Sequence, residues 1–344
     1  MSARTAAGTG SLAGALERFK FVPADVASYD TDAVGVARAL RVGPDEVADL
    51  ARAGLPCLDD PDRGPLFDYD DVMNVGKFSG TGITGPELAL RFLMRFSAMP
   101  PETWHSPRQW LVTVTASGPD GPGGPDMQCL PAGQVSLRGA DFTAPGIRRL
   151  AHQPAPGFMA PTGEEFQSQP FQAAVRITGA AHVIADPRVR PVFDEVVQPL
   201  VDQDVVFQSV AEPLRTDHNR AWCMGIADCM VASKVLADRL GDLGLPARVR
   251  RGYQLGLYAS DHAWCELFED GEYKPLDPLY SYLGRVGAAD IGLTPSSSFA
   301  AASFGGRFNR LLPFLGKDAE PLVYIGGRPA AYWALAGVSA RPYE

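Results

Sequence analysis

The chain has 344 residues, 46% of them apolar and 21% charged, a balance typical of a globular protein with room for two or three domains. Its formal charge of −9 argues against general binding to nucleic acid or anionic membranes, because both surfaces repel an acidic protein. No window approaches roughly 18 uninterrupted apolar residues and no leader pattern opens the chain, so we expect a cytoplasmic protein. Five widely spaced cysteines predict reduced thiols rather than a disulfide framework.

The first third of the chain predicts a small helical module. We expect a flexible arm over 1–30 and the module over 31–100, with helices at 34–41 and 44–53. The order of helix, helix, wing-like loop and FDYDDV resembles the small winged helix-turn-helix of the excisionase type. Acidic residues outnumber basic ones by nine to five over 33–77, whereas a DNA-reading module should be basic. We therefore expect a structural or partner-docking module.

The middle of the chain predicts one core helix followed by β structure. Thr84 and Glu87 have the spacing of a capping box ahead of an apolar helix. Residues 101–190 are predicted to be β-rich, with a strand at 109–116. An amphipathic helix after Asp186 leads into the next region.

A cysteine opens the most informative helix of the sequence. Asp228 can cap a helix that begins with Cys229 and continues through Leu240. Helical spacing turns Cys229 inward, and the free N–H groups and dipole at a helix start favour the thiolate, which is the reactive form. A buried structural cysteine also fits this position, because free cysteines are often small apolar core residues.

A histidine and an aspartate follow on the next two strands. Alternation over 262–268 places His262 on one face of a strand and Cys265 on the other. The Asp-Gly turn in 269–272 predicts a hairpin that carries Asp277 back past His262. A thiol, a base that takes its proton, and a carboxylate that holds the imidazole are what a cysteine nucleophile needs.

These residues match the pattern of a known family. Cys229 is followed after fifteen positions by Gly244 of GLPARVRRGY, then by HAW at 262–264 and PLDP at 275–278. Over about residues 205–285 this set resembles the transglutaminase-like superfamily of papain-like thiol enzymes. The resemblance implies an α+β fold whose nucleophile helix packs on an antiparallel sheet.

The resemblance also implies roles and boundaries. By that match Cys229 is the nucleophile, His262 the base and Asp277 the orienting acid. The catalytic core then spans 191–290, and 291–344 is a C-terminal extension that packs on it.

The chemistry implied is acyl transfer through a thioester on Cys229, with no cofactor. The oxyanion should meet the backbone N–H of Cys229 and one further donor, for which Trp222, Gln208 and Asn219 are candidates by chemistry alone. An amine as acceptor gives an amide-forming acyltransferase, and water gives a cysteine protease, amidase or deamidase. Some bacterial members that the chain resembles join an acyl group held on a carrier protein to an amine in specialised metabolism, and we favour that function.

Basic residues after the nucleophile helix suggest where an acidic carrier protein would dock. Arg248, Arg250 and Arg251, with Arg285 beyond, form a local basic surface if their strand edge faces outward. A solvated strand edge without a partner is the alternative.

Two non-catalytic interpretations remain open. Cys223, Cys229, His262 and Cys265 offer thiol and imidazole ligands for zinc, although alternation places His262 and Cys265 on opposite faces. A binding protein that kept the fold and lost the chemistry is the second. Metal is not expected if the triad interpretation holds.

Overall fold

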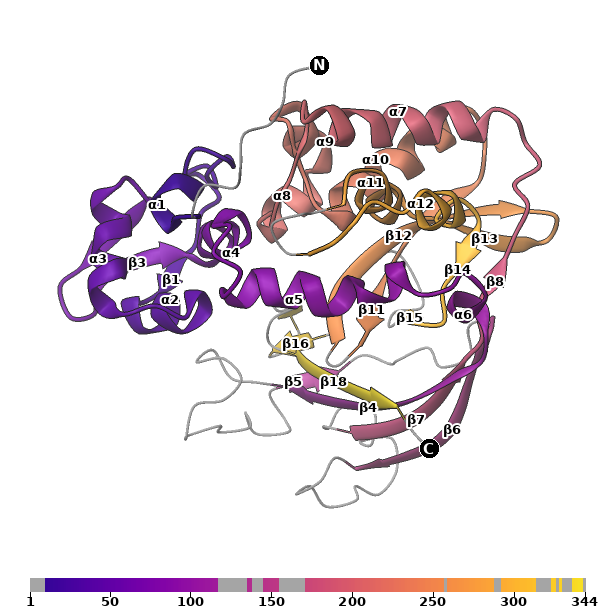
Figure 1. The fold of residues 1–344 in the computed structure, drawn as a ribbon, viewed down its shortest axis with the longest axis horizontal. Coiled ribbons are helices and arrows are strands. Elements are labelled where there is room, and N and C mark those ends of the chain that lie inside the picture. Colours follow the sequence, from indigo (N-terminus) through magenta and orange to yellow (C-terminus); the bar gives the residue numbers. More distant parts are fainter. Residues whose placement is uncertain are drawn as a thin grey trace.

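A computed structural model describes residues 10–116, 135–137, 145–154, 171–256, 259–287, 292–313, 323–325, 328–329 and 336–342. These residues form a mixed helix and sheet fold, in which an N-terminal helical module lies beside a larger body of helices and mainly antiparallel sheets (Figure 1). None of the helices in these ranges is long and apolar enough to cross a membrane.

The N-terminal module combines five helices with a small antiparallel sheet of order β1-β3-β2. Its elements are α1 (Leu12–Ala15), β1 (Tyr29–Thr31), α2 (Ala33–Leu40), α3 (Pro44–Arg52), β2 (Cys57–Asp60), β3 (Gly64–Asp68), α4 (Tyr69–Phe78) and α5 (Gly85–Met94). The predicted helices and the Thr84–Glu87 capping box are confirmed. Helix α5 runs from the module along the body (Figure 1). The likeness to a winged helix stays a prediction.

The expected arm over 1–30 is wrong for its described part. Residues 10–30 fold onto the module, where Ala15, Phe19 and Val22 are buried and the Phe19 ring stacks on Phe78 at 6.0 Å. The sequence around α1 is rich in small residues, so the apolar positions that pack there could not be recognised from the sequence pattern. Residues 1–9 lie outside the described ranges.

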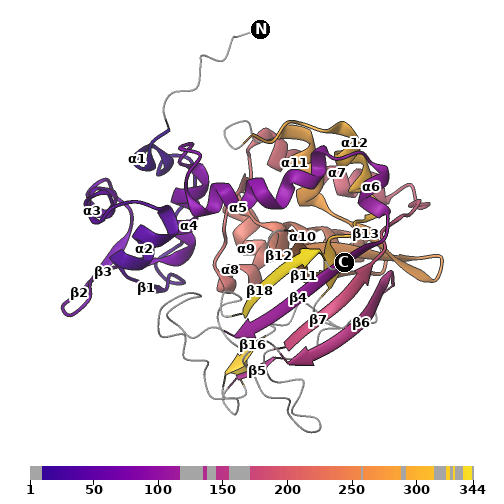
Figure 2. The same ribbon diagram turned by 60° about the horizontal axis from the view of Figure 1, so that its bottom comes forward.

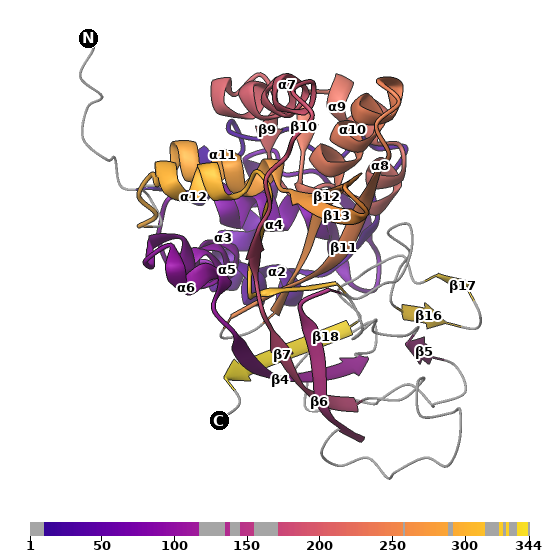
Figure 3. The same ribbon diagram turned by 90° about the vertical axis from the view of Figure 1, so that its right-hand side faces the viewer.

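The body is centred on a four-stranded antiparallel sheet of order β13-β12-β11-β15. Its strands are β11 (Ala247–Leu255), β12 (Ala259–Glu269), β13 (Glu272–Leu276) and β15 (Leu311–Pro313). Asp270 and Gly271 both have positive φ, 55° and 81°, so the predicted Asp-Gly hairpin joins β12 to β13. Helices α7 (Val189–Asp202), α10 (Cys229–Asp242) and α11 (Pro278–Val286) form a layer over this sheet (Figure 3).

A second sheet lies on the other side, with order β18-β4-β7-β6 (Figure 2). Its strands are β4 (Arg108–Ala116), β6 (Ile147–Pro154), β7 (Phe171–Ile177) and β18 (Ala336–Pro342). Three described segments form a smaller sheet, β5 (Val135–Leu137), β16 (Val323–Ile325) and β17 (Arg328–Pro329). The β structure expected over 101–190 is therefore present, and 291–344 contributes β15 and β18 to the two larger sheets.

Short elements connect these layers. They are η1 (Arg95–Ala98), α6 (Glu102–His105), β8 (Ala180–Ala181), β9 (Val206–Phe207), α8 (Glu212–Thr216), α9 (His218–Cys223), β10 (Ile226–Ala227), α12 (Ser297–Ala302) and β14 (Gly306–Arg307).

Two hydrophobic clusters meet at the start of α10. One contains α7, the middle of α10 and Cys265, and the other is aromatic, with Phe96, Tyr280 and Phe308 in edge contact. Cys229 belongs to the aromatic cluster, whereas the next turns of α10 belong to the first. The helix start is therefore fixed by packing on both sides.

Candidate active site

Helix α10 begins at Cys229, as predicted. The Asp228 carboxylate accepts the N–H of Val231 at 2.9 Å, which is the N-cap bond that starts the helix. Its other oxygen pairs with Nε of Arg215 at 2.5 Å. Cys229 is 8% exposed, so the thiol lies at a helix start and largely inside the protein.

The hairpin places Asp277 beside His262, also as predicted, although Asp277 lies just past β13 and caps α11. One carboxylate oxygen accepts the N–H of Tyr280 at 2.9 Å, and the other lies 2.7 Å from Nε2 of His262. Asp277 is 1% exposed and His262 3%. The Asp277 carboxylate thus caps helix α11 and also fixes the orientation of the His262 imidazole.

His262 also hydrogen-bonds the side chain of Cys229. Because Asp277 occupies Nε2, the other ring nitrogen remains for the thiol. Burial lowers the pKa of His262, but the charge and hydrogen bond of Asp277, followed by those of Cys229, outweigh it and raise that pKa to about 10. The three residues therefore converge at one buried place, in an arrangement that favours the protonated imidazole of His262.

Tyr280 is a neighbour that the sequence did not reveal. Its ring stacks on the His262 imidazole with centroids 4.5 Å apart and planes inclined by 11°. This contact holds the plane of the imidazole, while Asp277 holds its direction. The spacing of three residues from the capping Asp277 was the signal that could have identified Tyr280.

The side chains suggested as oxyanion donors have other contacts in the structure. The Gln208 amide is occupied, because it accepts the Lys20 N–H at 3.0 Å and donates to the Lys20 carbonyl at 2.7 Å. Asn219 is exposed on α9, and Trp222 packs against the α7 cluster with Arg239 over its ring. The backbone N–H of Cys229 stays a candidate, since the first N–H groups of a helix have no intrahelical acceptor.

The predicted docking surface is wrong for Arg250 and Arg251, which are 6% and 1% exposed. Arg248 and Arg250 both pair with Glu266, at 2.8 and 3.3 Å. Strand β11 is buried on both faces from residue 250 onward, because the second sheet lies against the central one. The alternative of a solvated strand edge fails for the same reason.

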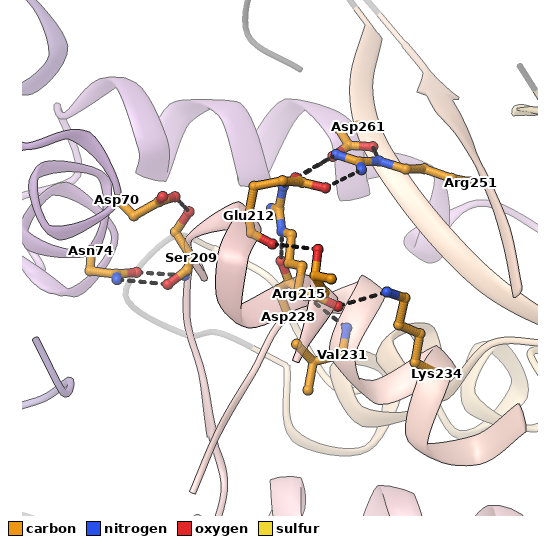
Figure 4. A network of polar contacts seen from close by, with 11 residues as sticks. Asp70, Asn74, Ser209, Glu212, Arg215, Asp228, Val231, Lys234, Arg251 and Asp261 are labelled. Atoms are coloured by element: carbon orange, nitrogen blue, oxygen red, sulfur yellow. Dashed lines mark hydrogen bonds and ion pairs between the residues drawn. The ribbon is translucent and has the colours of Figure 1, made fainter. Parts of the chain in front are cut away.

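Arg251 belongs to an ion-pair network around Arg215 (Figure 4). It pairs with Asp261 at 3.0 Å and with Glu212 at 2.8 Å, and Glu212 pairs with Arg215 at 3.1 Å. Arg215 in turn holds Asp228. The network therefore connects the residue before Cys229 to the residue before His262.

Two further interpretations of the sequence can be compared with the structure, namely the place of Arg285 in a basic surface and the zinc site. Arg285 pairs with Asp194 at 2.5 Å, which removes it from the predicted basic surface. Of the four residues in the zinc interpretation, Cys223 is exposed and Cys265 is fully buried, where burial raises the pKa of its thiol. No group of three or more His, Cys, Asp or Glu side chains suited to a metal occurs in the part of the chain that the structure describes.

No family model and no curated protein matches the chain. Among solved structures, it is similar to a "putative cysteine protease from Cytophaga hutchinsonii", with 12% identity and a TM-score of 0.23, over 68% of this chain and 95% of that one. A TM-score this low carries no argument about activity. The functional conclusion therefore depends on the geometry around Cys229, His262 and Asp277.

Proposed function

We propose that the protein is a cysteine-dependent acyl-transfer enzyme of the transglutaminase-like type, which holds its acyl group as a thioester on Cys229. The observation that carries this proposal is the buried contact chain from Cys229 to His262 to Asp277. A thiol at a helix start, a hydrogen-bonded imidazole and an orienting carboxylate are together the parts of a cysteine nucleophile.

The reaction would proceed in two steps. In the first, the Cys229 sulfur attacks the carbonyl carbon of the donor, and the His262 imidazolium gives its proton to the leaving group as the bond to that group breaks. In the second, His262 takes a proton from the acceptor, which attacks the thioester and releases Cys229. The backbone N–H at the start of α10 would meet the oxyanion in both steps.

The buried setting supports an amine as the acceptor. Cys229 lies in an aromatic cluster with Met94, Phe96 and Tyr280, and such surroundings limit the access of water to a thioester. Transfer to an amine forms an amide, while transfer to water makes the protein a hydrolase. Since the predicted basic surface is absent, a small thioester is the appropriate first donor.

Intact-mass analysis tests the proposal. Wild type, Cys229→Ala and Cys223→Ala are incubated with a small acyl thioester, with and without an amine. Cys223→Ala is the matched control, because it removes an exposed thiol six positions earlier. We expect an acyl adduct on wild type and on Cys223→Ala, none on Cys229→Ala, and discharge by the amine with formation of an amide.

Two outcomes would change the conclusion. Discharge at the same rate without amine would make the protein a hydrolase that uses the same thioester. An equal adduct on Cys229→Ala would show that another nucleophile carries the acyl group, and the proposal would fail.

A further inference from the structure

Arg215 is a largely buried cation that pairs with three carboxylates. It lies on α8, and its side chain is 18% exposed. Its Nε lies 2.5 Å from Asp228, while its Nη1 lies 3.1 Å from Glu212 and 3.6 Å from Asp261 (Figure 4). Glu212 belongs to α8 itself, Asp228 caps α10 and Asp261 lies on β12. One planar, forked guanidinium therefore joins three separate elements, which the single charge centre of a lysine is less suited to do.

The contact with Asp228 reaches the start of the nucleophile helix. Asp228 uses one oxygen for Arg215 and the other for the N–H of Val231, at 2.9 Å. Lys234, also on α10, donates its Nζ to the backbone carbonyl of Arg215 at 2.7 Å. Arg215 thus holds the first turns of α10 through its side chain and through its backbone. Cys229 lies directly after the first of these contacts.

The contact with Asp261 reaches the strand that carries His262. Asp261 directly precedes His262 on β12 and accepts two further bonds from Arg251, at 3.0 and 3.2 Å. Arg251 also donates to Glu212 at 2.8 Å, and Glu212 pairs with Arg215. The strand of the imidazole is therefore tied to the same guanidinium that fixes the start of α10.

We propose that Arg215 is a positioning residue of the thiol site, which keeps Cys229 within hydrogen-bond reach of His262 by holding the residue that precedes each of them. A base takes a proton efficiently only within hydrogen-bond reach of the donor, so a small displacement of either element slows the reaction of the thiol. Buried ion pairs limit such displacement, because breaking one leaves a charge uncompensated. The inference rests on the proposed function only in taking Cys229 as the nucleophile and His262 as its base.

The test measures alkylation of Cys229 by iodoacetamide near neutral pH, with peptide-resolved mass spectrometry. Arg215→Met should slow this reaction about tenfold, because the thiol and the imidazole are no longer held in place. Arg248→Met is the matched control, since it removes another partly buried arginine, 27% exposed, from its carboxylate partner. The control should keep the wild-type rate within about twofold.

Cys265 separates the loss of positioning from a general loosening of the fold. Its side chain lies on β12 and is fully buried, so it reacts only when the protein opens. If Arg215 only stabilised the fold, Arg215→Met would speed the alkylation of both buried thiols. Loss of positioning should instead slow the alkylation of Cys229 and leave that of Cys265 unchanged.

A double-mutant cycle shows whether Arg215 acts through the helix cap. Asp228→Asn keeps an acceptor for the Val231 N–H and removes the charge that Arg215 holds. It should also slow the alkylation of Cys229, and the double variant should be slowed by less than the product of the two single effects. Asp228→Asn serves alone if Arg215→Met does not fold, because it breaks the same ion pair without leaving an unpaired carboxylate.

The proposal is overturned if Arg215→Met or Asp228→Asn leaves the alkylation of Cys229 unchanged or speeds it. It is also overturned if Arg248→Met slows the reaction equally, or if the two single effects multiply in the double variant. No acyl donor is used, so a failure of the thioester experiment would leave this result unaffected. Slowing by His262→Gln but not by Arg215→Met would refute this inference and leave the proposed function standing.

Discussion

Strand β12 carries two buried charge systems, four residues apart on one face. His262 is bound by Asp277 and Cys229, whereas Glu266 is bound by Arg248 and Arg250. Both centres are almost inaccessible, at 3% and 6% exposed. Burial of charge is common to the two, so burial alone does not mark a catalytic site.

The difference lies in how completely each charge is compensated. Glu266 faces two guanidinium groups and also accepts the indole N–H of Trp264 at 3.3 Å. His262 has one carboxylate partner, and its other hydrogen-bond partner is a thiol, which can exchange a proton with it. A buried charge that its partners fully compensate stabilises the fold. A buried group that can exchange a proton with its neighbour can take part in chemistry.

Replacement of the histidine gives the largest expected difference between the two systems. His262→Gln should slow alkylation of Cys229 near pH 7 by about 100-fold or more, because the thiol loses the base that accepts its proton. Alkylation of exposed Cys223, measured in the same digest, should not change. Glu266→Gln is the matched control on the same strand face and should keep the wild-type rate within about twofold. If both variants slowed the alkylation of Cys229 equally, the His262 and Glu266 systems would not differ in their effect on the thiol.

The Glu266 system should affect stability instead. Glu266→Gln leaves Arg248 and Arg250 without their shared carboxylate, and breaking a buried pair in this way costs about 3 kcal/mol. Denaturant unfolding followed by circular dichroism measures this loss. A change below about 0.5 kcal/mol would show that solvent compensates these arginines.

Stability should also depend on pH through His262. Its pKa is about 10 in the folded protein against an ordinary 6.5, so the stabilisation is complete below about pH 6.5 and is lost as the pH rises toward 10. We expect the free energy of unfolding to fall by on the order of 5 kcal/mol across that window. Asp277→Asn removes the charge that raises this pKa and should flatten the slope. Denaturation at a series of pH values measures it, and parallel slopes would contradict the assignment.

The smallest expected effect comes from the Tyr280 hydroxyl. It is buried and has no hydrogen-bond partner among the residues that the structure describes. Tyr280→Phe keeps the ring stacked on His262 and removes a buried polar atom, so unfolding should change by no more than about 1 kcal/mol, toward greater stability. A thermal melt with a parallel alkylation assay checks both properties. Slower alkylation would show that the hydroxyl itself contributes to the site.

Local signals in the sequence predicted much of the candidate thiol site. Asp228 and Cys229 indicate the start of a helix. The Asp-Gly turn indicates the hairpin that pairs the strand of His262 with the strand before Asp277. Each of these features depends on residues within a few positions of one another. The sequence could therefore place them without knowledge of the remaining chain.

The arginines show where such reasoning fails. Three arginines on one short strand fit an exposed edge, but β15 pairs with β11 and the second sheet lies against the central one. The second sheet is built from residues 108–116, 147–154, 171–177 and 336–342. No sequence pattern near Arg250 indicates that those distant segments pack against its strand.

The sequence alone determined which side chains have the chemistry of a thiol site and on which local elements they lie, because capping, turn formation and strand alternation act over a few residues. Tertiary structure decided which groups surround that site, since Tyr280 stacks on His262 by packing. The same packing buried Arg251 in ion pairs, away from the surface role that its chemistry suggested. Contacts between elements far apart in the chain depend on burial and shape, which no short pattern encodes.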